Sequence, residues 1–142
     1  MELLWGVVIV GLGLLAWGGQ VVTWLAPEAA ARLSLTEAED AVDAVYWADL
    51  RGEARWDAMT LWTLPLAGLL LIVGHQAWAW LGLFAAGMYV YFAGRGVLAR
   101  LELQGRAHRI GEPRDVRVAM GVLVVWGVAG LITAVAATVS LA

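Results

Sequence analysis

The sequence predicts an all-α integral membrane protein, a bundle of four transmembrane helices, and three observations support this prediction. Hydrophobic residues make up 62% of the 142 residues, whereas soluble domains contain about 45–50% apolar residues. Four apolar stretches are each long enough to cross about 30 Å of hydrocarbon as a helix. All nine basic side chains are arginines, and they gather in and beside only two of the connecting segments.

The first span covers about residues 3–25, which carry no charge and are followed by Ala26-Pro27. No basic residue precedes this apolar run, and the run is longer than the core of a signal peptide. We therefore expect a retained helix and not a cleaved leader. The last span covers about residues 118–141.

The second and third spans cover about residues 58–74 and 77–97. The polar residues 74–76 (Gly-His-Gln) between them predict a tight hairpin, because a single helix through both stretches would be far longer than a bilayer is thick. Pro65 is the only proline inside a span, so we expect four unbroken helices. All four spans belong to one domain, residues 1–142.

The arginines set the orientation of the predicted bundle. Segments of about 26–57 and 98–117 face one side of the membrane, while both termini and the turn at 75–76 face the other. The first segment and the second with its adjoining helix ends hold every arginine, and lysine and arginine concentrate in cytoplasmic loops. We expect a multi-pass protein of the cell's inner (plasma) membrane with both termini outside the cytoplasm.

The first loop is expected to contain an amphipathic helix. Thr36 and Glu39 have the spacing of a capping box, which predicts a helix that begins there and continues to Asp57. An apolar stripe along it would face the cytoplasmic mouth of the bundle. The stripe consists of Ala38, Ala41, Val42, Val45 and Ala48.

Two pairs of similar segments suggest an internal repeat. Residues 31–35 resemble 99–103, and residues 52–55 resemble 111–114. A repeat would make the protein two parallel helical hairpins. Chance matching in a chain rich in Ala, Arg and Leu is the alternative.

Asp49, Glu53 and Asp57 lie four residues apart, so three carboxylates would share one helix face and repel one another. A divalent cation, arginines of the second loop or solvent are the alternatives for compensating them, which makes these residues weak metal-ligand candidates. Residues 26–57 hold eight acids and three arginines, net −5, whereas residues 95–117 hold six arginines and three acids, net +3. These opposite charges favour pairing between the two loops.

Arg95 is predicted about one turn inside the cytoplasmic interface. Its guanidinium either extends to lipid phosphates or binds an anion at the floor of a cytoplasm-facing cleft. Arg114 and Arg117 are its expected neighbours in anion or headgroup contact.

Small residues at four-residue spacing predict close contacts between helices. They are Gly82 with Ala86 and Gly130 with Ala134. The contacts lie either inside the bundle or on the face of a homo-oligomer.

Composition excludes several kinds of site. Without cysteine there are no disulfides and no cysteine-ligated metal centres. His75 and His108 would lie on opposite sides of the membrane, so one chain cannot hold a bis-histidine haem. We expect no cofactor and no nucleic-acid partner; the expected partners are the lipid bilayer and, as alternatives, a second copy of the chain or a larger membrane complex.

The layout resembles that of the membrane-associated proteins in eicosanoid and glutathione metabolism (MAPEG). Residues 75–100, with Tyr89, Tyr91 and Arg95, are similar to the third helix of that family. The resemblance implies outward termini, a long first cytoplasmic loop, trimers and glutathione bound between subunits. The family's Asn-x-x-Glu motif is missing, since residues 53–57 read Glu-Ala-Arg-Trp-Asp, and no functional residue is carried over.

The sequence favours a non-catalytic subunit, scaffold or lipid-contacting factor. A membrane enzyme acting on a lipophilic substrate at the cytoplasmic interface is the alternative, with Glu53, Asp57 and Arg95 as candidate catalytic residues. A small transporter or channel is a second alternative. No Asp, Glu or His lies near the middle of a span, which argues against proton-coupled transport.

Overall fold

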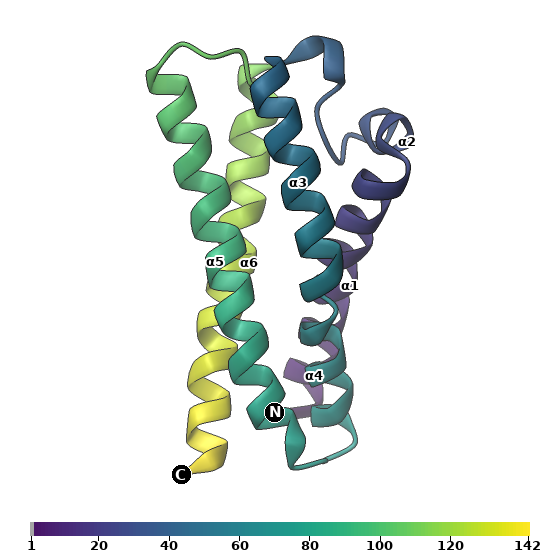
Figure 1. Ribbon diagram of the computed structural model, residues 1–142. Coiled ribbons are helices and arrows are strands. Elements are labelled where there is room, and N and C mark those ends of the chain that lie inside the picture. Colours follow the sequence, from purple (N-terminus) through teal and green to yellow (C-terminus); the bar gives the residue numbers. More distant parts are fainter. Residues whose placement is uncertain (1) are drawn as a thin grey trace.

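The computed structural model describes residues 2–142, and helices make up most of this part of the chain (Figure 1). The helices are α1 (Glu2–Leu25), α2 (Pro27–Arg32), a 3-10 turn η1 (Glu39–Ala41), α3 (Ala44–Thr60), α4 (Thr63–Ile72), α5 (Ala77–Gly105) and α6 (Pro113–Leu141). The described residues contain no strand, only an isolated antiparallel bridge between Val42 and Ile110.

Three helices, α1, α5 and α6, are long and apolar enough to cross a membrane. The fold is therefore that of an all-helical membrane protein. Helices α5 and α6 contain 29 residues each, about 43 Å at 1.5 Å per residue, so they are longer than the hydrocarbon core is thick.

The helices run side by side between two ends of the molecule (Figure 1). The N-terminus, the turn at 73–76 and the C-terminus lie at one end, here called the turn end. The two longer connections, residues 33–43 and 106–112, lie at the other, here called the loop end. Helix α6 packs chiefly on α5, and α1 packs chiefly on α4 and α3.

The predicted second span is not one unbroken helix, and that prediction is wrong. Helix α3 ends at Thr60 and α4 begins at Thr63. The physical reason is Pro65, which has no N–H to donate to the Leu61 carbonyl and whose ring crowds that carbonyl. In the structure Leu61 lies in the turn between the two helices.

Four consecutive carbonyls at this break accept hydrogen bonds from side chains. Such donors satisfy carbonyls that the interrupted helix leaves without intrahelical partners. Two of them come from neighbouring helices, Trp17 on α1 and Tyr89 on α5, so they also fix the break in place. The bonds are Trp17 Nε1 to Ala58 O (2.9 Å), Trp62 Nε1 to Met59 O (2.9 Å), Thr63 Oγ1 to Thr60 O (2.8 Å) and Tyr89 OH to Leu61 O (3.0 Å).

Small residues set the closest helix contacts. A Cβ added at Gly68 on α4 would lie 2.9 Å from the Gly6 carbonyl oxygen of α1. A Cβ at Gly130 on α6 would lie 3.1 Å from the Ala86 carbonyl oxygen of α5. Of the two alternatives for the small residues of α5 and α6, packing inside the bundle therefore accounts for Gly82, Ala86 and Gly130, which are all buried.

The helix predicted in the first loop begins later than expected. Thr36 and Glu39 form no capping box; η1 follows Ala38, and α3 begins only at Ala44. The expected apolar stripe is also wrong, since Val45 is 81% exposed and only Val42 of its five members is buried. The buried face of α3 instead contains Tyr46, Leu50, Ala54, Asp57 and Ala58.

The segments that suggested a repeat do not share local structure. Residues 31–35 end α2 and enter a turn, whereas 99–103 are fully helical. Residues 52–55 lie inside α3, whereas 111–114 lead into α6. The sequence matches therefore have no structural counterpart at these positions.

Candidate functional site

The loop end is held together by polar contacts between segments distant in sequence. Arg51 of α3 donates hydrogen bonds to the carbonyls of Thr23 and Trp24, the latter at 2.8 Å. These carbonyls belong to the last turn of α1, where no intrahelical donor is available to them. The Arg55 guanidinium lies 6.0 Å from the centre of the Trp24 ring. Arginines of α3 thereby fix the end of α1.

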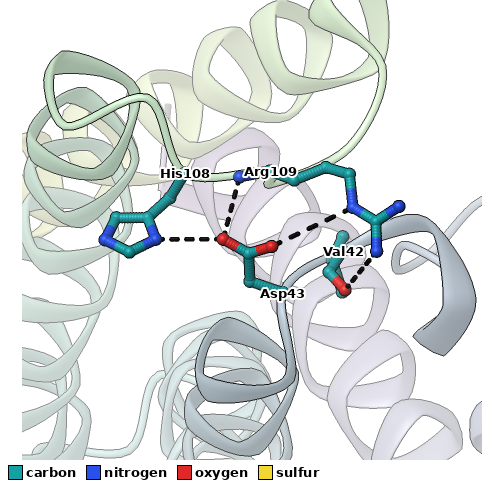
Figure 2. A network of polar contacts seen from close by, with 4 residues as sticks. All are labelled: Val42, Asp43, His108 and Arg109. Carbon is teal, nitrogen blue, oxygen red and sulfur yellow. Dashed lines mark hydrogen bonds and ion pairs between the residues drawn. The ribbon is translucent and has the colours of Figure 1, made fainter.

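Asp43 joins the two loops (Figure 2). Its Oδ2 lies 2.9 Å from His108 Nδ1 and accepts a hydrogen bond from the Arg109 backbone N–H at 3.1 Å. The Arg109 guanidinium donates to the Val42 carbonyl at 3.3 Å. The His108 and Arg109 contacts lower the pKa of Asp43. Because this carboxylate is engaged across the loops, it does not cap α3, which it precedes.

An apolar cluster supports this junction. Val42 and Tyr46 pack with Leu50, Ile110 and Val116, all of them buried. Polar contacts and burial together bring the start of α3 against the start of α6.

Two of the three predicted carboxylates pair with Arg95. Its Nη2 lies 2.7 Å from Asp49 Oδ1, and its Nη1 lies 2.6 Å from Glu53 Oε1. Of the alternatives that the sequence left open, pairing with arginine therefore accounts for Asp49 and Glu53. The Arg95 guanidinium is thus held by two carboxylates. Its expected neighbours Arg114 and Arg117 are exposed and form no ion pair within residues 2–142.

Asp57, the third carboxylate, is in a different environment. It precedes the predicted second span and is only 3% exposed, and its Oδ2 has no hydrogen-bond partner among the described residues. A buried carboxylate oxygen without a hydrogen-bond partner costs free energy. We therefore expect Asp57 to destabilise the fold when it is ionised.

A cleft of about 520 Å³ lies between α1, the first loop, α3, α5 and α6 at the loop end. Its volume is within the range of about 300–1,000 Å³ typical of small-molecule sites. One part of the lining comes from Leu15 and Ala16 of α1, Phe92 of α5, and Leu123 and Trp126 of α6, and this part is apolar.

The lining becomes polar toward the loop end. Glu37 of the first loop, Arg100 of α5, and Glu112 and Asp115 at the start of α6 line this part of the cleft. We call these four residues the charged rim. A cleft that is apolar at depth and charged at its rim matches the polarity profile of an amphiphile.

The cleft is open to the side between α1 and α6. Trp126 donates a hydrogen bond to the Leu12 carbonyl at 2.9 Å and closes the floor there. Above it, Leu15 on α1 and Val118 and Val122 on α6 line the cleft and are 68%, 59% and 40% exposed. These side chains border an apolar opening on the outer face of the bundle.

Only one of the candidate catalytic residues borders this cleft. Glu53 lines it, whereas Asp57 and Arg95 do not. No group of three His, Asp or Glu side chains within residues 2–142 is arranged to hold a metal ion, so the weak metal candidates Asp49, Glu53 and Asp57 do not form such a group.

Sequence reasoning missed the charged rim. Its members come from three segments that only the folded chain brings together. One local signal was available at Gly111, which has a φ of +110° and where a Cβ would lie 2.8 Å from Glu37 Cγ. The positive φ favours glycine at this position, and the missing side chain lets Glu37 of the first loop lie against the start of α6.

No family model matches the chain, and comparison with curated proteins and with solved structures gave no match either. The resemblance to the MAPEG family therefore remains one of layout.

Proposed function

We propose that this chain is a four-span protein of the inner membrane that holds a membrane lipid in the loop-end cleft without transforming it, a lipid-contacting factor. The observation that carries the proposal is the cleft itself, with its apolar depth, its charged rim and its opening between α1 and α6. A lipid can enter such a site laterally, from within the bilayer, while its acyl chains remain in the hydrocarbon.

In this proposal α3 and α4 together make the second crossing. Leu66, Leu69 and Val73, in and just after α4, are exposed, as expected of side chains that face acyl chains. The side-chain donors at the break supply the hydrogen bonds that lipid cannot. The turn that follows α4 lies at the same end as both termini (Figure 1).

The loop end faces the cytoplasm in this proposal. Every arginine lies on the loop-end part of the chain, which is the side that the positive-inside rule assigns to the cytoplasm.

The ion pairs favour holding over catalysis. Glu53, the one catalytic candidate in the cleft lining, lies 2.6 Å from Arg95. A carboxylate engaged by a guanidinium in this way is not free to exchange a proton with a substrate.

The test compares two glycines of α1. A Cβ at Gly19 or at Gly11 meets no atom within 4 Å, but only Gly19 lines the cleft. We expect Gly19→Phe to fill the cleft and reduce the lipid retained by the detergent-purified protein about tenfold, measured by native mass spectrometry. Gly11→Phe is the matched control and should retain lipid as the wild type does. Equal retention in both variants would contradict the proposal.

A further inference from the structure

The charged rim is not neutralised by the protein. Among residues 2–142, none of Glu37, Arg100, Glu112 and Asp115 forms an ion pair. Glu53 also lines the cleft, but Arg95 compensates it. Three carboxylates therefore share the rim with one guanidinium, and both signs of charge are left without a partner.

The guanidinium of Arg100 is positioned to bind an anion. Its Nη1 donates to the Gly96 carbonyl at 3.0 Å, which holds the side chain along α5. Its Nε is buried and has no hydrogen-bond partner within the described part of the chain. A buried donor left unsatisfied destabilises the fold, and the guanidinium fork suits phosphate oxygens.

Carboxylates bind most strongly to a cation that carries hydrogen-bond donors. A primary ammonium has three N–H donors for them, whereas a quaternary ammonium has none. Recognition of quaternary ammonium groups relies on aromatic side chains. The aromatic side chains in the lining, Phe92 and Trp126, belong to the apolar depth and not to the charged rim.

We infer that the cleft selects a zwitterionic phospholipid with a primary-amine headgroup, its ammonium among Glu37, Glu112 and Asp115 and its phosphate on Arg100. This inference rests on the proposed function. It adds the chemical class of the lipid, which the shape of the cleft alone does not give.

The placement agrees with the position of a lipid in a bilayer. The rim lies at the loop end, where α5 and α6 extend past the hydrocarbon, so a headgroup would remain at the interface. An acyl chain would pass along Trp126 and leave through the opening bordered by Leu15 and Val122. An anionic phospholipid without an amine would place its extra negative charge or its hydroxyls beside three carboxylates.

The experiment measures headgroup selectivity of the full chain. The purified protein is exchanged into mixed micelles with equal amounts of phosphatidylethanolamine, phosphatidylcholine and phosphatidylglycerol of identical acyl chains, and retained lipid is identified by native mass spectrometry. We expect retention of phosphatidylethanolamine at least about fivefold above either other lipid.

Variants then separate the two halves of the headgroup. The double variant Glu112→Gln/Asp115→Asn should retain lipid but lose the preference for the amine headgroup. Arg100→Gln should reduce retention of all three phospholipids. Arg106→Gln, which replaces an exposed arginine just after α5 and outside the cleft lining, is the matched control and should leave both unchanged. Each of the three variants introduces only polar side chains, at positions that are not fully buried. Circular dichroism checks that each variant is folded.

The outcomes distinguish the inference from the proposed function. If lipid is retained but without preference, or with phosphatidylglycerol favoured, the headgroup assignment is wrong while the lipid-holding function stands. If the wild type retains no lipid, both are wrong.

Discussion

At the turn end, glycines let helix backbones meet, whereas at the loop end polar side chains join segments around an open cleft. Gly6 and Gly68 bring α1 and α4 within contact of their backbones. Near the loop end, α1 and α6 instead border the cleft, and the contacts of Asp43 and Arg95 connect the surrounding segments. Helices in lipid associate through close packing, whereas the loop end relies on contacts between charged and polar side chains.

The two ends therefore differ in role. The turn end supplies rigidity through a close α1–α4 contact that leaves no room for a Cβ at Gly68. The loop end supplies a site, and part of its stability depends on which groups carry charge.

The largest expected effect concerns Asp57. The residue is 3% exposed, and its Oδ2 has no hydrogen-bond partner among the described residues. An ionised carboxyl in such a place costs several kcal/mol of stability. We expect Asp57→Asn, which removes the charge and keeps the shape, to raise the melting temperature in detergent at pH 8.

The contrary outcome for Asp57 is equally clear. If the wild type and Asp57→Asn melt at the same temperature at pH 8 and at pH 5, the carboxyl is not held in a costly buried state.

A substitution at the turn end tests the close packing of α1 against α4. Gly68→Leu would place side-chain atoms where a Cβ already lies 2.9 Å from the Gly6 carbonyl oxygen. We expect a loss of about 3 kcal/mol or more in the free energy of unfolding, since backbone atoms cannot move aside as a flexible side chain can. Gly87→Leu on α5, where a Cβ meets nothing within 4 Å, is the control. Equal stability of the two variants would show that the α1–α4 contact is loose.

The smallest expected effect concerns Asp43. Asp43→Asn keeps its shape but weakens the contacts with His108 and the Arg109 N–H. We expect faster amide hydrogen exchange in residues 106–112, with exchange in the middle of α5 and α6 unchanged. Because contacts with His108 and Arg109 lower the pKa of Asp43, their contribution is present above pH 4 and is lost as pH falls through the lowered pKa. Unchanged exchange in 106–112 would mean that the apolar cluster alone joins the loops.

Apolar length made much of the fold predictable. The helices expected near 3–25, 77–97 and 118–141 are present as α1, α5 and α6, because continuous apolar runs have few other stable structures in lipid. The break before Pro65 was missed because a proline in the first turn of a helix and one inside a helix look alike in sequence; only the start of α4 at Thr63 distinguishes them.

The contacts of the site were predictable only where segments of opposite net charge lie on the same side of the bundle. The pairing of Asp49 and Glu53 with Arg95 was among the expected alternatives, because the two loops carry opposite net charge. The start of α3 at Ala44 was not predicted. Asp43, the residue before it, contacts the second loop, and a helix-capping pattern in the sequence cannot predict such a contact. The charged rim depends on how Glu37 meets Gly111, a contact between residues far apart in sequence.

Single cysteines test directly whether the broken α3–α4 pair crosses the membrane, because the chain has no cysteine of its own. Glu39, Gln76 and Gln104 are all exposed, and each is replaced by cysteine and labelled in intact cells with a membrane-impermeant maleimide. We predict that only Gln76→Cys reacts from outside, while Glu39→Cys and Gln104→Cys react after permeabilisation. Labelling of Glu39→Cys and Gln76→Cys from the same side would show that α3 and α4 do not cross, and would contradict the account.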